Sequence, residues 1–249
     1  MKLYGLLGNK LAHSFSVKYF FEKFQSDRIS DKFGYRNFEI PDLNEFIKLV
    51  DSETQLFGLN VTIPYKEKII PYLNNVDEVA ADTGAVNTIK IQRGSTGNLL
   101  FMEGYNTDAV GFQSAISPLL LPHHKGALIL GNGGAAKAVQ FTLKKIAIPF
   151  ISVTRQHDSN LMFDELKKDH FSQYPVIINT TPLGTFPDID DSPPIPYHLL
   201  SPENLLFDLV YNPEMTTFMK QGIAHGAKVE NGLKMLQAQA EASWEIWNS

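Results

Sequence analysis

The sequence predicts an α/β protein, because short apolar segments alternate with amphipathic ones along its 249 residues. Two further observations favour mainly parallel sheets. Several apolar segments are short and uninterrupted, as in strands buried on both faces, and a glycine-rich loop stands between one such segment and a helical pattern. A chain of this length suffices for two compact domains, and we expect the boundary near Gly104.

The first hundred residues are expected to alternate strands with helices. Strands are predicted at residues 2–7, 35–40, 58–63, 85–92 and 99–103, and helices at 17–24, 43–50 and 66–73. Asp42 is a candidate N-cap of the second helix. Pro64 suits the first turn of the third helix, which would place Lys66 in that turn.

The remaining residues are expected to form a second parallel sheet covered by helices. The pattern predicts strands at residues 127–130, 150–154, 176–179 and 205–209, helices at 107–120 and from the glycine loop to about 146, and a loop at 182–196. A final helix would carry one apolar face made of Leu233, Leu236, Ala240, Trp244 and Trp247.

The composition limits the classes of function. The net charge is −5 and there is no cysteine, which disfavours nucleic-acid partners and excludes disulfides and thiolate chemistry. We expect no membrane contact and a cytoplasmic protein, because no apolar segment is long enough for a signal sequence or a membrane span. The scattered histidines show no metal-ligand spacing, so we expect no metal.

The loop at residues 131–136, Gly-Asn-Gly-Gly-Ala-Ala, matches the dinucleotide-binding pattern G-x-G-x-x-[G/A]. Its glycines allow the backbone to approach a pyrophosphate, and the following helix offers free N–H groups to that anion. The candidate cofactor residues in this loop are Gly131, Asn132, Gly133, Gly134 and Ala135. The alternative is a plain glycine-rich turn.

The end of the next strand, at Thr154 and Arg155, indicates which cofactor is bound. Arg155 can bind the 2′-phosphate of NADP, whereas an NAD-binding protein typically has an acidic residue there. We therefore expect NADP rather than NAD. Asp158 is the residue that would favour NAD, and the alternative for Arg155 is an exposed surface arginine.

Polar side chains near predicted strand ends are candidates for a substrate site, because α/β proteins bind ligands at the carboxyl edge of the sheet. Asn60, Thr62 and Lys66 follow one strand, and Lys66 is a candidate for proton transfer. Asp108, at the start of the helix at residues 107–120, is its candidate partner. The alternatives are a solvated surface lysine and an aspartate that stabilises its helix terminus.

Two serines, Ser14 and Ser16, lie in the loop after the first strand. Hydroxyl groups at this spacing can bind a carboxylate. The alternative for Ser16 is a structural N-cap of the helix predicted at residues 17–24.

Seven segments, taken in order, resemble motifs of the shikimate dehydrogenase family. They are residues 8–16, 60–66, 84–88, 104–111, 179–184, 208–213 and 231–239. The second resembles N-V-T-x-P-x-K and the fourth G-x-N-T-D-x-x-G, and the resemblance covers nearly the whole chain. It implies a substrate-binding and catalytic domain, residues 1–103 with 233–249, and a Rossmann-type NADP-binding domain, residues 104–232. The substrate would lie in the cleft between these domains.

The resemblance implies reversible NADPH-dependent reduction of 3-dehydroshikimate to shikimate, a step of aromatic amino acid biosynthesis. Lys66 and Asp108 would move the proton at the 3-hydroxyl. The substrate-binding positions would be Ser14, Ser16, Asn60, Thr62, Asn87, Tyr211 and Gln239. Of these, Asn87, Tyr211 and Gln239 come from the resemblance alone. Further cofactor positions would be Thr180, Val210, Gly232 and Met235, the last two near the nicotinamide.

Several positions depart from the family's pattern. Lys10 and Val17 replace common prolines, so we expect a looser first loop. Thr154-Arg155-Gln156 replaces the usual N-R-T, and Lys137 and Ser159 stand where arginines are frequent, which predicts weaker binding of NADP. Three alternatives stay open: a quinate/shikimate dehydrogenase that uses NAD, a catalytically silent binding protein of the same fold, and another two-domain dehydrogenase, such as one acting on a folate. A monomer and a homodimer are equally compatible with the sequence.

Overall fold

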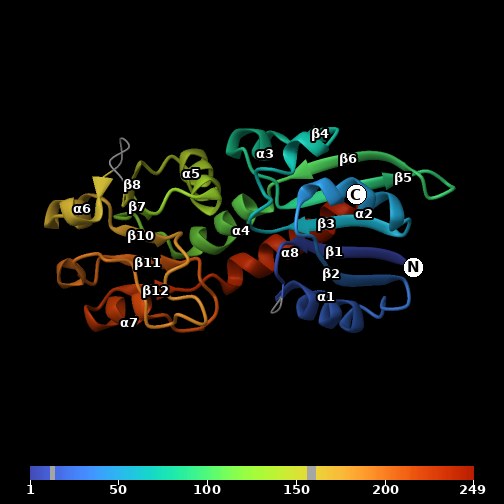
Figure 1. The fold of residues 1–249 in the computed structure, drawn as a ribbon. Coiled ribbons are helices and arrows are strands. Elements are labelled where there is room, and N and C mark those ends of the chain that lie inside the picture. Colours follow the sequence, from blue (N-terminus) through green and yellow to red (C-terminus); the bar gives the residue numbers. More distant parts are fainter. Residues whose placement is uncertain (12–14, 156–160) are drawn as a thin grey trace. The chain divides into compact units, whose positions relative to one another are not determined.

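The computed structural model describes residues 1–11, 15–155 and 161–249 (Figure 1). The chain forms two compact units: unit 1 is Met1–Thr107 with Ala240–Ser249, and unit 2 is Asp108–Gln239. Each unit contains one sheet, and strands alternate with helices along the chain. The predicted α/β class is therefore confirmed. The domain boundaries expected from the sequence lie after residues 103 and 232, slightly before the boundaries in the structure, which lie after residues 107 and 239.

Unit 1 is built on a mixed sheet with the strand order β2-β1-β3-β5-β6-β4. Its strands are β1 (Lys2–Gly8), β2 (Phe33–Glu39), β3 (Leu56–Val61), β4 (Asn75–Val76), β5 (Thr88–Arg93) and β6 (Leu99–Tyr105). β1 is parallel to β2 and β3, β4 is parallel to β6, and β5 is antiparallel to both neighbours. The helices before the crossing to unit 2 are α1 (Phe15–Ser26), α2 (Phe46–Ser52) and α3 (Glu78–Thr83). The carboxyl ends of β1, β2 and β3 therefore share one edge.

The prediction of a helix at residues 66–73 is wrong. This segment forms turns, followed by a short 3₁₀ helix at Ile70–Tyr72. Pro71 lies inside the predicted helix, where it lacks an N–H group and disfavours helical backbone at the residue before it. Lys66 therefore does not lie in the first turn of a helix, where the sequence had predicted it.

Capping residues explain two further differences from the predicted elements. Asp77 accepts the Ala80 N–H at 2.8 Å and caps α3, which ends at Gly84 with a left-handed φ of 61°. This helix was absent from the sequence prediction although both end signals are present. Asp42 caps a 3₁₀ turn at Leu43–Glu45 that precedes α2, rather than α2 itself.

A buried aromatic cluster fastens the end of the last helix, α8 (Leu233–Asn248), within unit 1. Trp247 is stacked on Tyr4 with ring centroids 4.6 Å apart, and its indole N–H donates to the Ile89 carbonyl at 3.0 Å. Gly58 of β3 makes room for this indole, because a Cβ at Gly58 would lie 2.3 Å from Nε1. The cluster also contains Phe20, Phe24, Ala240 and Trp244. The apolar face predicted for this helix thus packs into unit 1 at Ala240, Trp244 and Trp247.

Unit 2 contains a sheet with the order β12-β11-β10-β7-β8-β9, in which the described pairs are all parallel. Its strands are β7 (Ala127–Leu130), β8 (Phe150–Thr154), β9 (Leu161–Met162), β10 (Val176–Asn179), β11 (Leu205–Asp208) and β12 (Lys228–Glu230). Its helices are α4 (Thr107–Ile116), which begins at the last residue of unit 1's first segment, α5 (Gly134–Lys145), α6 (Lys168–Gln173) and α7 (Thr217–Ala224). Numbered from β7, this is the Rossmann order 3-2-1-4-5-6.

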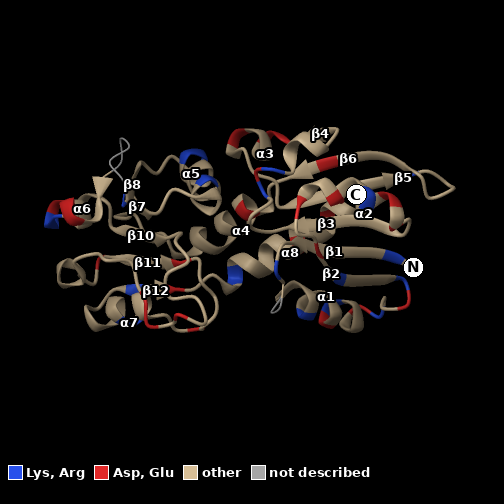
Figure 2. Ribbon diagram, in the orientation of Figure 1, with Lys and Arg blue, Asp and Glu red and all other residues tan. Residues whose placement is uncertain are grey.

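The central strands of this sheet are buried and nearly uncharged. Figure 2 shows them in tan, with the charged residues of unit 2 mainly on helices and loops. The strands β7, β8 and β10 match their predicted bounds, because uninterrupted apolar runs are typical of parallel strands covered on both faces. The short edge strands β9 and β12 and the helices α6 and α7 were not predicted. Within the described residues, no helix is long and apolar enough to cross a membrane.

We expect Trp247→Ala to lower the free energy of unfolding by about 3–5 kcal/mol, because it leaves a large cavity and an unpaired carbonyl at Ile89. Urea denaturation followed by circular dichroism measures this change. Glu245→Ala, at an exposed position of the same helix, is the matched control and should change stability by less than about 0.5 kcal/mol.

Tyr4→Phe provides a second control inside the cluster. The Tyr4 hydroxyl is buried and finds no hydrogen-bond partner among the described residues, so its removal should leave stability unchanged or increase it. A Trp247→Ala variant as stable as these controls would contradict the role of the cluster.

Candidate functional site

The sheet of unit 2 has a topological switch point between β7 and β10. β7 pairs with β8 on one side and with β10 on the other, so the chain continues in opposite directions across the sheet from this point. Rossmann-type proteins bind ligands outside the carboxyl ends of the strands at such a point. Here β7 leads into the glycine loop and β10 leads into residues 180–184.

The glycine loop has the backbone geometry that its sequence predicts. Gly131 has a φ of 109°, and a Cβ there would lie 2.8 Å from Thr180 Oγ1. Thr180 donates that hydroxyl to the Leu130 carbonyl at 2.7 Å. Gly133 is the N-cap of α5, no side chain caps this helix, and a Cβ at Gly133 would meet nothing within 4 Å. The helix therefore begins with uncapped N–H groups beside open space, an arrangement that binds phosphate groups.

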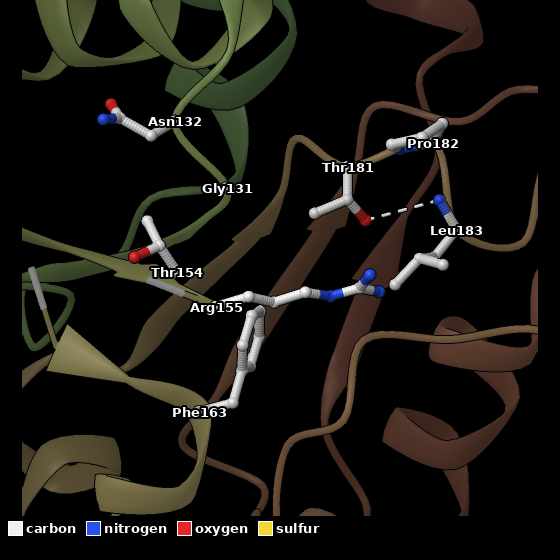
Figure 3. Close-up of a pocket in the computed structure, with 8 residues that line it drawn as sticks. All are labelled: Gly131, Asn132, Thr154, Arg155, Phe163, Thr181, Pro182 and Leu183. Carbon is white, nitrogen blue, oxygen red and sulfur yellow. Dashed lines mark hydrogen bonds between the residues drawn. The ribbon is translucent and has the colours of Figure 1, made fainter. Parts of the chain in front are cut away.

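A pocket of about 470 Å³ adjoins this loop (Figure 3). It is lined by Gly131, Asn132, Thr154, Arg155, Phe163, Thr181, Pro182 and Leu183. Figure 3 shows the glycine loop on one side and residues 181–183 on the other, with the guanidinium of Arg155 directed toward Leu183. Four of the predicted cofactor residues thus line one pocket: Gly131, Asn132, Thr154 and Arg155.

Arg155 gives this pocket a positive charge. Its side chain is exposed, and no described carboxylate forms an ion pair with it. An unpaired guanidinium can form charge-assisted, bidentate hydrogen bonds with a phosphate. Asp158 and Ser159, which the sequence analysis weighed for the same choice of cofactor, lie outside the described residues.

These features fit a dinucleotide with a phosphorylated ribose. The uncapped start of α5 suits the pyrophosphate, and the Arg155 guanidinium suits a 2′-phosphate. In residues 1–11, 15–155 and 161–249, no group of three His, Asp or Glu side chains has the arrangement of a metal site.

In unit 1, hydrogen bonds join Ser16 to Asn60 through Tyr35. The Ser16 hydroxyl bonds to the Tyr35 hydroxyl, which donates to Asn60 Oδ1 at 2.9 Å. Burial raises the pKa of Tyr35, and the bond from Ser16 only partly opposes this, so the phenol stays protonated. Because α1 begins at Phe15, Ser16 lies inside the helix, and its interpretation as the N-cap is wrong.

The amide of Asn60 continues this network. Its Nδ2 donates to Ser243 Oγ at 2.8 Å and to Thr88 Oγ1 at 3.2 Å. Ser243 and Thr88 are fully buried and hydrogen-bonded to one another at 2.8 Å. A side chain from α8 thus orients the amide of a predicted substrate residue on β3.

Asn87 fixes the start of α4. Its Oδ1 accepts the Thr107 N–H at 2.7 Å and the Thr107 hydroxyl at 3.1 Å. Asp108 follows directly in the first turn of α4 and is 4% exposed. The amide of Asn87 therefore fixes the backbone and side chain of Thr107, the residue before Asp108.

Thr62 and Lys66 lie just beyond the end of β3, and both are half-buried. The Thr62 N–H donates to the Leu7 carbonyl at 3.0 Å, and the Lys66 carbonyl accepts the Val86 N–H at 2.8 Å. The backbone on both sides of the turn is therefore anchored to neighbouring segments of unit 1. Lys66 belongs to unit 1 and Asp108 to unit 2.

The other predicted positions of unit 2 do not line the pocket of Figure 3. Val210 and Met235 are buried, Gln239 is half-buried and Tyr211 is 37% exposed. Gly232 donates its N–H to the Val210 carbonyl at 3.1 Å. In unit 1, the predicted residue Ser14 lies outside the described residues.

These arrangements also contain residues that were not predicted from the sequence, among them Thr181, Ser243, Tyr35 and Phe163. Thr181 lies in the motif at residues 179–184, so its signal was present. Ser243 is the polar residue on the apolar face of the last helix, a position that indicates a buried hydrogen bond. Tyr35 and Phe163 carry no comparable signal, because aromatic residues in strands and turns are usually part of a core.

Comparisons with known proteins find relatives over nearly the whole chain. Residues 6–89 match the family model of the shikimate dehydrogenase substrate binding domain. A protein named shikimate dehydrogenase (NADP(+)) from Methanococcus maripaludis is 34% identical over 265 residues. The match covers 99% of this chain and 91% of that protein. Its namesake from Clostridium beijerinckii is 36% identical over 261 residues, covering 99% and 92%.

Two solved structures support the same relationship. Shikimate 5-dehydrogenase from Thermus thermophilus, in complex with NADP(H) and shikimate, has a TM-score of 0.84 and 29% identity, covering 99% of this chain and 93% of that one. A shikimate dehydrogenase solved in complex with NADP+ has a TM-score of 0.83 and 32% identity, covering 99% and 89%. With this identity and coverage, the chain belongs to the shikimate dehydrogenase family.

Proposed function

We propose that this chain is an NADP-dependent shikimate dehydrogenase, which reversibly reduces 3-dehydroshikimate to shikimate. The observation that carries this proposal is the uncapped start of α5 with Arg155 beside it, at the switch point of a Rossmann sheet. The name shared by relatives that match 99% of the chain supports the choice of substrate.

We assign the cofactor to unit 2 and most of the substrate contacts to unit 1. In unit 2, the loop at residues 131–135 would hold the pyrophosphate and Arg155 the 2′-phosphate of NADP. In unit 1, Tyr35 and Thr88 link the side chains of Ser16, Asn60 and Asn87 by hydrogen bonds. We assign these three side chains to the substrate, because hydroxyl and amide groups suit a small polyhydroxylated carboxylate. Tyr211 and Gln239 of unit 2 complete the proposed substrate contacts.

Oxidation of the 3-hydroxyl removes a hydride from carbon and a proton from oxygen. NADP+ supplies the hydride acceptor when it is bound. Lys66 and Asp108 would take the proton and return it in the reverse reaction, because amine and carboxylate side chains held against a reacting hydroxyl can act as general bases and acids. The low exposure of Asp108 favours this role, since a buried carboxylate is shielded from exchange with bulk water.

The test of this function is NADPH formation, measured by absorbance with shikimate and NADP, beside quinate and NAD in every pairing. We expect turnover mainly with shikimate and NADP. Turnover mainly with quinate or NAD would assign the chain to the quinate/shikimate alternative. Folded protein without turnover in any pairing would favour the silent binding protein.

We expect Lys66→Met and Asp108→Asn each to lower kcat by roughly 100- to 10,000-fold, the usual contribution of proton transfer by a positioned side chain. The dissociation constant of NADP should change little, because neither residue lines the pocket of Figure 3. Lys68→Met, an exposed lysine two positions further along, is the matched control and should keep its turnover. Normal kcat in either variant would remove that residue from the chemistry.

We expect Arg155→Ala to raise KM for NADP roughly 10- to 100-fold, equivalent to the loss of one or two charge-assisted hydrogen bonds. KM for NAD should change by less than about threefold, since NAD lacks the 2′-phosphate. Steady-state kinetics with both cofactors at saturating shikimate measure the two effects. An equal loss with NAD and NADP would show that Arg155 does not recognise the 2′-phosphate.

A further inference from the structure

The central strands of the unit 2 sheet are uncharged except for one carboxylate. The strands β7, β8, β10 and β11 contain a single charged residue, Asp208 at the end of β11. Its side chain is 0% exposed. A charge in this position is costly unless it is fully hydrogen-bonded, so its presence calls for a physical reason.

Asp208 accepts three hydrogen bonds from three different segments. Oδ1 accepts from Asn179 Nδ2 at 2.9 Å and from the Val210 N–H at 3.0 Å, and Oδ2 accepts from Thr216 Oγ1 at 2.6 Å. Burial raises the pKa of Asp208 to about 6, with these three bonds acting in the opposite direction. Above that pH the group is a carboxylate that can accept all three.

The bond to Asn179 reaches the cofactor pocket. Asn179 Oδ1 accepts from the Thr181 N–H at 3.0 Å and from the Thr181 hydroxyl at 2.7 Å. The Thr181 hydroxyl oxygen in turn accepts the Leu183 N–H at 3.3 Å. Thr181 and Leu183 both line the pocket in Figure 3. The carboxylate is therefore two hydrogen bonds away from the pocket wall opposite the glycine loop.

The bond to Val210 reaches a second segment. The Val210 carbonyl accepts the Gly232 N–H, and a Cβ at Gly232 would lie 2.1 Å from the Leu209 carbonyl oxygen. The backbones at residues 209–210 and 232 are thus packed directly on one another. Displacement of Val210 would displace Gly232 as well.

We propose that Asp208 is a positioning residue for NADP binding. It holds the loops at residues 180–183 and 209–211 in place through its hydrogen bonds with Asn179 and Val210. It touches no cofactor itself. This inference rests on the proposed function only for the identity of the ligand. The hydrogen bonds that it invokes lie entirely within unit 2.

Four variants separate positioning from general stabilisation. Asp208→Ala and Asn179→Ala break the path to Thr181, and each should raise the dissociation constant of NADP about tenfold or more, the equivalent of one lost hydrogen bond. Asp208→Asn keeps an oxygen for Asn179 and Val210 and can donate to Thr216, so the rise should stay below about threefold. Thr216→Val also removes a bond to Asp208 but leaves both pocket loops attached, and should likewise stay below about threefold.

The experiment is NADP titration by calorimetry at pH 8, with hydrogen exchange of the Thr181, Leu183 and Val210 amides on the same variants without ligand. Faster exchange at Val210 in Asp208→Ala, and at Thr181 and Leu183 in both Asp208→Ala and Asn179→Ala, is expected together with the weaker binding. Folded Asp208→Ala with unchanged binding and unchanged exchange would overturn the proposal, as would a Thr216→Val variant that weakens binding equally.

The two proposals can fail separately. If the unaltered protein does not bind NADP, the proposed cofactor is wrong, and the exchange rates still decide whether Asp208 holds the loops. If Asp208→Ala does not fold, Asn179→Ala and Asp208→Asn provide the same comparison. Unchanged exchange at Thr181 and Leu183 in Asn179→Ala would then overturn the proposal.

Discussion

The pairing of β10 beside β7 is the constraint on which unit 2 depends. Because β8 occupies the other side of β7, the segments that follow β7 and β10 diverge at the carboxyl edge and leave room between them. The features of the cofactor pocket meet at that divergence: the uncapped α5, Arg155 at the end of β8, and the wall at residues 181–183. Asp208, one strand further along, is placed to hold that wall because β11 ends at the same edge.

In unit 1, a network of hydrogen bonds fixes the orientation of candidate substrate side chains. The candidate substrate residues are not left as isolated polar groups but share donors and acceptors, from Ser16 through Tyr35 to Asn60, and from Asn60 to Ser243. A buried amide that satisfies several partners has few alternative orientations. The final helix contributes to this order, because its aromatic residues fasten it to the sheet and place Ser243 against Asn60.

The sequence predicted correctly those strands and helices whose burial leaves a pattern in neighbouring residues. The strands at 127–130, 150–154 and 176–179 and the last helix were predictable because uninterrupted apolar runs and helical spacing reflect burial directly. The helix at residues 66–73 was wrong because the effect of Pro71 on the preceding turn outweighed the apolar spacing. Short edge strands such as β9 and β12 were not predicted, because a strand of two or three residues is too short to show a periodic pattern.

The sequence by itself determined the α/β class, the glycine loop, the candidate polar residues and the family, because these depend on residue types at fixed spacing along the chain. Only the tertiary structure decided which of those residues share a network. Tyr35 lies between Ser16 and Asn60, and Asp208 joins Asn179 to Val210, through hydrogen bonds between segments distant in sequence. Such partners are chosen by strand order and register, which bring the segments to one edge, and no local pattern records that choice.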